Sequence, residues 1–289
     1  MATSRTRRGG PLPTGFPGPG TITGMEFEDD AALHLICTER LGEEAGGRFA
    51  ATARRGFRLE RPADGAPATG RCRLGGPALL EPGTPWPVHD GMPLSLLAVL
   101  DTDALAPWLG DHLPVRPGLL NFFQLDPDVP YEQYAKLDTS SPAMYRVLPA
   151  DPARAVETDA PGPATRYPAV PVRTEGVVML PDCWDVEDED LPFDRDAHWG
   201  APSLLLDTME GLNGNTADRH RAFGWPDTSY GSPVTVRDAD GPAVHLLQLA
   251  GDAELNWGWG DAGSLYFTIP AGALAAGDFT RVGAEGRCC

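Results

Sequence analysis

An α+β fold in which β-strands dominate is the architecture that this sequence predicts. Its apolar runs are four to nine residues long, rich in branched and aromatic side chains, and bounded by Gly, Pro or Asp, which is typical of strands. Thirty prolines and thirty-four glycines interrupt the 289 residues too often for a helical bundle. A recurring order of landmarks further predicts an internally duplicated sheet unit packed into one globule.

Eight runs carry the strand prediction. They span residues 93–101, 118–125, 144–148, 176–180, 233–238, 243–250, 264–269 and 279–286. Residues 28–47 begin with acidic side chains and end in glycines, as a helix does, although "LHLIC" within them also fits a strand. Short helical turns are expected at 101–110, where Asp101 or Asp103 can cap, and at 271–278.

The internal repeat consists of five landmarks that recur in one order. The first copy contains Trp86-Pro87, Asp90-Gly91, Pro93, "LLAVL" from Leu96 and "GLLNFF" from Gly118. The second copy contains Trp225-Pro226, Asp240-Gly241, Pro242, "LLQLA" from Leu246 and "GSLYF" from Gly263. Chance recurrence of apolar alternation is the alternative. We expect a disordered, basic, Pro/Gly-rich tail at 1–24 and a single domain over 25–289, with pseudo-repeats at about 73–150 and 218–289.

The charge balance constrains the partners. Asp and Glu number 41 against 23 Lys and Arg, which gives a net charge of −18 at pH 7. Such a chain repels phosphate backbones, so nucleic acid is not expected as a partner, whereas a basic protein, a cationic peptide or a metal ion fits the charge. An acidic surface that only keeps the protein soluble is the plainer alternative. The run from Asp182 to Asp196 holds eight carboxylates but no glycine, so it fits a solvated loop better than a calcium-binding loop.

Cysteine usage and hydropathy favour a cytoplasmic location. The five cysteines are scattered without a C-x-x-C pair, and no window reaches the roughly eighteen apolar residues of a membrane span. The chain start lacks the apolar segment of a secretory signal. Cys288 and Cys289 could be a lipidation or redox signal, but we interpret them as a strand end that carries thiols.

Few residues are candidates for catalysis. The six histidines lack metal-binding spacing, and nucleophile and phosphate-binding motifs are absent, so neither a metal nor a cofactor is expected. His220 precedes a turn and, with Asp227 and Asp261, could form the cluster of a metal-assisted hydrolase. A histidine that only bonds a turn is the alternative.

Tryptophans mark a candidate binding surface. Trp86 and Trp225 lie at turns of the two copies, and Trp257 and Trp259 precede the run 264–269. If these turns meet at one groove, the rings could stack on a small molecule, a peptide or a cation beside Asp261. Core side chains beneath loops are the alternative. The first copy has no counterpart of the last two tryptophans and Asp261, so a duplication leaves these three residues unexplained.

Four segments resemble the YwqG-like family, a bacterial domain of unknown function. They are "RLGGPALLEPGTPWPVHDGMPLSLLAVLDTDAL" (73–105), "GLLNFFQLD" (118–126), "HRAFGWPD" (220–227) and residues 245–282, so the resemblance covers about 72–283. It implies a single, mostly β domain of the α+β class with a duplicated sheet. Where the family has a glutamine in two strands, this chain has Val99 in the first and Gln248 in the second. Some members are thought to lie near toxin systems, which implies an immunity-type, partner-binding role and no reaction.

These observations predict a cytoplasmic, non-enzymatic binding or protein-interaction module that is the acidic partner of a basic protein. A metal-assisted hydrolase and a small-molecule binder at the tryptophan turns are the alternatives.

Overall fold

The structure is a computed structural model that describes residues 30–63, 66–181, 220–226, 237–238, 240–261 and 263–288. Several sequence predictions fall elsewhere. The tail 1–24, the acidic run 182–196, Asp227, Cys183 and Cys289 lie outside the described residues.

Most strands belong to two antiparallel sheets. The larger sheet contains β1 (Arg54–Glu60), β11 (Arg173–Met179), β12 (His220–Phe223), β13 (Arg237–Asp238), β14 (Gly241–Ala250), β15 (Ser264–Pro270) and β16 (Gly283–Arg287). The smaller sheet contains β2 (Arg73–Leu74), β6 (Ser95–Asp101), β7 (Leu119–Gln124), β8 (Tyr145–Ala150) and β10 (Val170–Pro171). The strand orders are β11-β1-β12-β14-β15-β16, with β13 on β14, and β10-β2-β6-β7-β8.

Smaller elements flank these sheets. Two-stranded ribbons are formed by β3 (Ala78–Leu80) with β9 (Val156–Thr158) and by β4 (Val88–His89) with β5 (Met92–Pro93). The α-helices are α1 (Asp30–Leu41), α2 (Glu43–Ala50), α3 (Thr102–Leu109), α4 (Tyr131–Tyr134) and α6 (Ala271–Ala276). The 3-10 helices are η1 (Gly110–His112), η2 (Pro142–Met144) and η3 (Phe279–Arg281). The fold is therefore α+β and β-dominated, as predicted.

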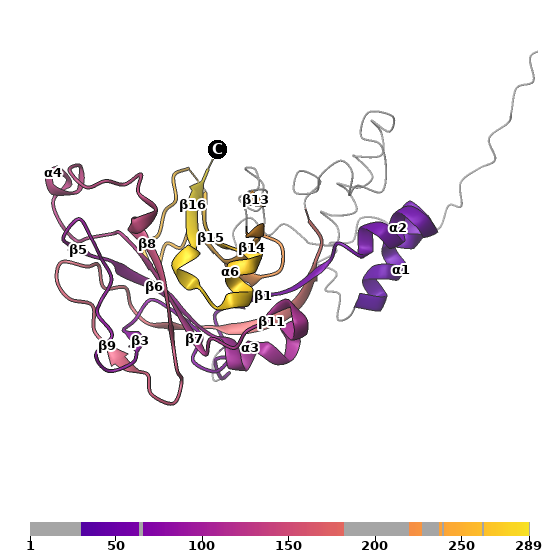
Figure 1. Ribbon diagram of the computed structural model, residues 1–289, viewed down its shortest axis with the longest axis horizontal. Helices are drawn as coiled ribbons and strands as arrows, with labels where there is room; N and C mark the ends of the chain where they lie inside the picture. The colour runs from indigo at the N-terminus through magenta and orange to yellow at the C-terminus, as the bar shows by residue number, and fades with distance from the viewer. Residues whose placement is uncertain are drawn as a thin grey trace, which may run out of the picture.

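The two sheets pack on each other through apolar faces. In Figure 1, β6 to β8 lie on one side of the junction and β14 to β16 on the other. Phe122 of β7 and Phe267 of β15 meet there edge to face, with ring centroids 5.2 Å apart, and both side chains are fully buried. Each aromatic ring removes a large apolar area from water, so this contact lies at the centre of the main core.

The two sheets also share a pattern of strands. The order β2-β6-β7-β8 in the smaller sheet matches β12-β14-β15-β16 in the larger one. The β6–β7 register shifts between Leu96 and Ala98, and the β14–β15 register shifts between His245 and Leu247. When these shifts are superposed, Phe122 corresponds to Phe267. Equivalent residues that touch each other are typical of a two-fold relation. The duplication stays a prediction, and its landmarks differ from this superposition, which places Pro77 and not Trp86 opposite Trp225.

The end of β2 and the end of β12 are each marked by two consecutive residues with positive φ. Gly75 and Gly76 have φ of +59° and +78°, and Phe223 and Gly224 have φ of +58° and +66°. A side chain on Gly75 would overlap the carbonyl oxygen of Pro168, so glycine is required there for close approach as well as for its φ. This close approach brings residues 167–169 against the smaller sheet.

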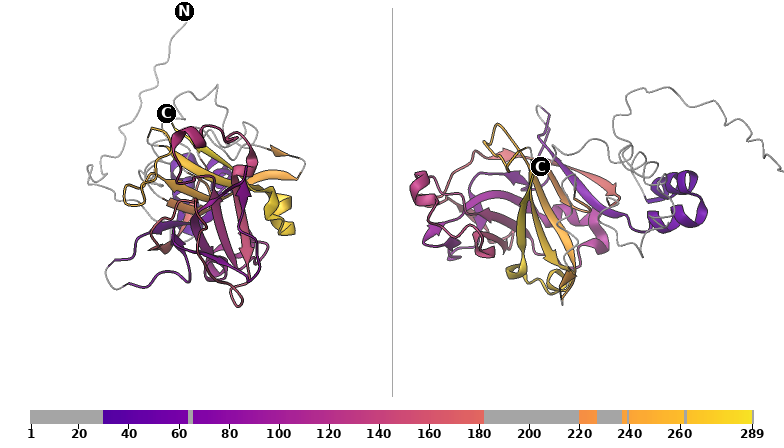
Figure 2. Two further views of the ribbon diagram at one scale, coloured as in Figure 1. Left: turned by 90° about the vertical axis from the view of Figure 1, so that its left-hand side faces the viewer. Right: turned by 90° about the horizontal axis from the view of Figure 1, so that it is seen from above.

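The N-terminal helical segment differs from its prediction. Residues 28–47 were expected to end at glycines, but α2 continues through Gly46 and Gly47, and the break falls at Gly42, where φ is +85°. A side chain on Gly46 would overlap the backbone of Cys37, so this glycine lets α1 and α2 touch. The pair packs beside β11 at one end of the molecule, as Figure 2 also shows. Within the described ranges, no helix has the length and apolar character that crossing a bilayer requires.

Replacing Phe122 or Phe267 with alanine is expected to lower the free energy of unfolding by about 3–5 kcal/mol, because either change leaves a cavity between the sheets. Tyr131→Ala is the control, since its side chain is 78% exposed and the change should be within about 0.5 kcal/mol. Urea unfolding followed by circular dichroism measures all three variants. Equal midpoints for Phe122→Ala and Tyr131→Ala would contradict the central role of this contact.

Candidate functional site

The turn between β14 and β15 is organised by Asp252, which the sequence analysis did not identify. Its side chain is 5% exposed, and its two oxygens accept hydrogen bonds of 3.0 and 2.8 Å from Nη2 of Arg61, just beyond β1. The backbone N–H groups of Glu254 and Leu255 donate to Oδ1 at 2.9 and 3.1 Å. Asp252 therefore stabilises the turn by accepting hydrogen bonds from its backbone, and it links the turn to Arg61 at the end of β1.

His220, at the start of β12, completes this cluster. Its Nδ1 accepts a 3.1 Å hydrogen bond from the backbone N–H of Ala250, so in the neutral ring the proton is assigned to Nε2. Nε2 lies 3.4 Å from Oδ2 of Asp252, to which it donates. Burial lowers the pKa of His220, although Asp252 opposes this shift. The ring is neutral near pH 7, and both of its nitrogens are engaged.

The charge of Asp252 is set by the same contacts. Burial by itself would raise the pKa of the Asp252 carboxyl, but hydrogen bonds from Arg61, from the N–H of Leu255 and from His220 hold that pKa below its usual value. The carboxylate is therefore ionised at neutral pH. Because its lone pairs and those of His220 are used within the protein, the arrangement holds the turn and leaves no evident base for a substrate.

Aromatic rings pack around this cluster. Trp257 meets Tyr167 and His220 edge to face, with centroids 5.5 and 6.0 Å apart, and Trp259 lies 6.1 Å away at a tilt. Trp257 is 6% exposed, and Nε1 of Trp259 donates to the carbonyl oxygen of Ala250 at 3.2 Å. The rings therefore contact one another and the strand end, so they stabilise the turn first of all.

Tyr167 connects the turn to the first half of the chain. Its hydroxyl donates to Oδ2 of Asp126, just beyond β7. Burial raises the pKa of Asp126, and the charge of Asp128 adds to this shift. The Trp257 cluster therefore lies where the two halves meet.

The other predicted site residues lie apart. Trp86 packs against Phe123, with centroids 5.2 Å apart, in an apolar cluster formed by side chains of β3, β6 and β7. Trp225 lies beneath the guanidinium of Arg54, which is 3.5 Å from its ring centroid. It belongs to a separate small apolar cluster with Val177 and Met179 of β11. The four tryptophans thus occupy three packing clusters instead of one groove. Asp261 is exposed on the turn and Asp227 lies outside the described residues, so the carboxylate that the structure places against the predicted histidine is Asp252.

The glycines of the turn have a structural explanation. Gly260 has φ of +70°, and a side chain there would lie 2.5 Å from Sγ of Cys288. A side chain on Gly263 would overlap the carbonyl oxygens of Trp259 and Arg287. The turn is therefore pressed against the end of β16, and bulkier residues would force it away.

Cys72 occupies the position in the first half that His220 occupies in the second. The backbone N–H of Asp101 donates to Sγ of Cys72 at 3.3 Å, just as the N–H of Ala250 donates to the imidazole. Burial raises the pKa of Cys72 to about 12, so this residue stays a thiol. The same backbone position thus holds an inert sulfur in one half and a polar cluster in the other.

A row of polar side chains crosses one face of the larger sheet, namely the face that points away from the smaller sheet. Pairing registers align Glu175, Arg58, Arg221, Gln248, Tyr266 and Glu285 on successive strands. The exposed fractions of Arg58, Arg221 and Gln248 are 5%, 3% and 0%. Sequence reasoning singled out Gln248 alone, because only the strand pairing brings these residues together.

His245 lies beside this row and is fully buried. Its Nδ1–H donates to the carbonyl oxygen of Phe223 at 3.0 Å. Burial, together with the charges of Arg221 and Arg54, lowers the pKa of His245 to about 4, although the hydrogen bond to Phe223 opposes this shift. His245 is therefore neutral at physiological pH.

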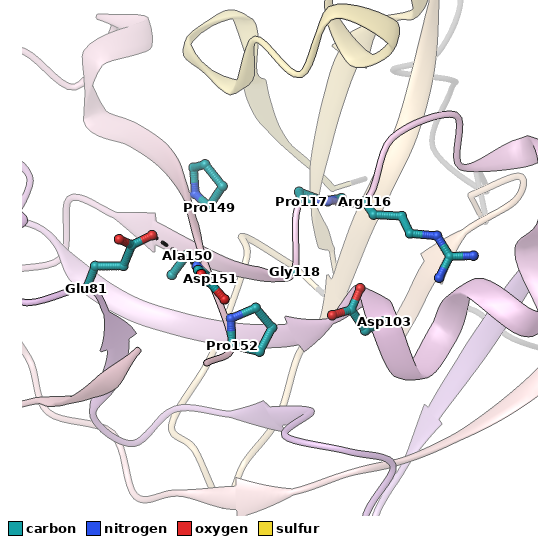
Figure 3. A pocket seen from close by; sticks show the side chains of 9 residues that line it. All are labelled: Glu81, Asp103, Arg116, Pro117, Gly118, Pro149, Ala150, Asp151 and Pro152. Atoms are coloured by element: carbon teal, nitrogen blue, oxygen red, sulfur yellow. Dashed lines mark hydrogen bonds between the residues drawn. The ribbon is translucent and has the colours of Figure 1, made fainter. Parts of the chain in front are cut away.

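An open pocket of about 350 Å³ lies at the rim of the smaller sheet (Figure 3). Its lining consists of Glu81, Asp103, Arg116, Pro117, Gly118, Pro149, Ala150, Asp151 and Pro152. Glu81 pairs with Arg154 at 2.7 Å and accepts the backbone N–H of Asp151 at 3.1 Å. The sequence analysis did not find this pocket, because distant segments close it by strand pairing. Over the described ranges, no group of three or more His, Cys, Asp or Glu side chains is arranged to hold a metal ion.

The protein is thus a β-dominated fold of two packed sheets, and contacts of Asp252 hold the turn between β14 and β15 in place. A family model described as a domain of unknown function, DUF1963, matches residues 72–288. The chain belongs to this family, because the match covers well over half of its length. A comparison with curated proteins found no match.

Asp252→Ala is expected to lower the free energy of unfolding by about 1–3 kcal/mol, because it leaves the backbone N–H of the buried Leu255 and the Nε2–H of His220 without an acceptor, whereas the 43% exposed Arg61 can turn to water. Glu254→Ala is the matched control in the same turn, since this side chain is 75% exposed and the change should cost less than about 1 kcal/mol. Denaturant unfolding followed by tryptophan fluorescence measures both. Equal stability of the two variants would show that Asp252 does not organise the turn.

His245 should make stability depend on pH. Because the pKa is about 4 when folded and about 6.5 when unfolded, the unfolded chain takes up the proton first as pH falls. His245 therefore contributes a loss of about 3 kcal/mol as the pH falls from 6.5 to 4, and none above that window. In His245→Gln the free energy of unfolding should fall less steeply across this range. Identical slopes, measured by urea unfolding at each pH, would contradict the assignment.

Proposed function

We propose that the protein is a non-enzymatic binding module whose partner is a basic protein. The observation that carries the proposal is the charge balance of 41 acidic against 23 basic residues. A surface with this excess of carboxylates attracts a cationic partner over a distance set by the ionic strength, and it repels acidic competitors. Electrostatic attraction of this kind raises the association rate and favours partners that carry a positive net charge.

The geometry of the histidine cluster supports binding over catalysis. A hydrolase built on His220, Asp227 and Asp261 needs a histidine nitrogen or a carboxylate that faces a substrate. In the described part of the chain, His220 is instead engaged by Ala250 and Asp252. The tryptophan turn gives similar support, because Trp257 is 6% exposed and its ring is in contact with other rings. Among the described residues, the hydrolase gains no specific observation in its favour. The small-molecule alternative keeps one, because the buried Nε1–H of Trp257 has no hydrogen-bond partner, but a single N–H within packed rings does not define a ligand.

We also propose a finer relationship within the family. The match at 72–288 almost coincides with the range 72–283 over which the chain resembles the YwqG-like proteins. On this proposal, residues 25–289 form one domain that acts in the cytoplasm as an immunity-type partner. The resemblance supports the partner-binding role, whereas the negative net charge of this protein supports a positively charged partner.

Affinity capture at two salt concentrations tests the proposal. Immobilised full-length protein is exposed to lysate of the source cell at about 50 mM and about 500 mM salt, and retained proteins are identified by mass spectrometry. We expect a basic protein to be retained in stoichiometric amount at low salt and to be weakened at high salt. A matched column carries an unrelated protein of similar net negative charge. If both columns retain the same proteins, the capture is simple ion exchange and the proposal fails.

A further inference from the structure

We propose that the pocket of Figure 3 receives an arginine side chain of the basic partner. This inference rests on the proposed function and names the chemistry of one contact. The pocket volume of about 350 Å³ lies near the lower end of the range typical of ligand sites, which suits one side chain better than a cofactor.

The walls of the pocket suit the stem of a long side chain. Three of its lining residues are prolines, at positions 117, 149 and 152. Their rings are apolar and rigid, and a proline has no backbone N–H to offer. A methylene chain and a planar guanidinium both pack well on such surfaces, and the donors of a guanidinium need acceptors elsewhere in the pocket.

The charges of the lining supply such an acceptor. Glu81, Asp103 and Asp151 face a single basic residue, Arg116. Arg154 already compensates Glu81 and Asp151, at 2.7 and 3.0 Å. Asp103 is exposed in the first turn of α3, and Figure 3 shows its carboxylate on the pocket side, whereas the guanidinium of Arg116 points away from the proline rings. Asp103 is therefore the carboxylate best placed to pair with an incoming cation.

The floor of the pocket is held in place by backbone contacts. The carbonyl oxygen of Gly118 accepts hydrogen bonds from the N–H and the hydroxyl of Thr102, at 2.8 and 2.6 Å. A side chain on Gly118, where φ is +75°, would lie 2.5 Å from Cδ of Pro152. The pocket is consequently formed before a ligand arrives, which reduces the entropy lost on binding.

Arginine fits this pocket better than lysine does. Its guanidinium is flat enough to lie on a proline ring while it donates two hydrogen bonds to the carboxylate of Asp103. A lysine ammonium is a compact, strongly hydrated charge that gains less from the proline rings. The difference in shape between the two side chains, at equal charge, makes the assignment testable.

Nuclear magnetic resonance of the full-length, ¹⁵N-labelled protein tests the assignment. The probes are blocked tripeptides with glycine on either side of arginine, lysine or citrulline. We expect the arginine peptide to shift the amide signals of Gly118 and Ala150 in a saturable way, the lysine peptide to bind more weakly, and the neutral citrulline peptide to leave them unchanged. Asp103→Asn should weaken the arginine peptide about threefold.

Asp111→Asn is the matched control, because Asp111 is an exposed carboxylate of η1 outside the pocket lining, and it should leave the affinity unchanged. Equal affinities of the two variants, or shifts spread over the whole surface, would overturn the inference. Equal binding of lysine and arginine would overturn the choice of arginine. If lysate capture succeeds and the peptide fails, only this inference falls. If the peptide binds and no basic partner is captured, the proposed function falls instead.

Discussion

The face-to-face packing of two apolar sheets, with Phe122 against Phe267 at its centre, is the contact on which the rest of the structure depends. Each unit of four strands has one inner face that must leave water, and in this chain the other unit covers it. Once the sheets are joined, the ends of their strands have fixed positions. The Asp252 turn and the proline-lined pocket both lie at such ends, so the core determines where the two sites are.

The two halves share backbone positions but assign different chemistry to them. Cys72 and His220 each accept a hydrogen bond from a strand-end N–H, yet only the histidine has a carboxylate beside it. After the paired strand, the first half continues into α3, whereas the second half forms the tryptophan turn. The space at one strand end is consequently an open pocket, and aromatic rings pack near the corresponding end in the other half. On the proposed function, this difference lets one half stabilise the fold while the other half presents the binding surface.

Sequence patterns predicted the buried strands well because most of their own side chains are apolar and buried. β6, β7, β14 and β15 all lie within predicted runs or extend them by a few residues. β1 was missed, since arginines alternate with Phe57 and Leu59 and its place inside the sheet depends on pairing with two distant strands. Within the site, His220 and the tryptophans were identifiable as residue types. Asp252 was not, because its importance comes from Arg61, which is 191 positions away along the chain.

The contacts of the arginines decide which carboxylates remain for a cationic partner on the proposed function. Arg58 and Arg221 are at most 5% exposed on the outer face of the larger sheet, and Arg61 and Arg154 are each in contact with two carboxylates. The net charge of −18 counts these arginines in full. An ion pair projects only a weak field into water, because the charge of each arginine and the charge of the carboxylate that it contacts offset each other. These contacts therefore leave the excess of 41 acidic over 23 basic residues unchanged, and on the proposed function an approaching guanidinium is drawn most strongly to exposed carboxylates such as Asp103 that lie outside the pairs.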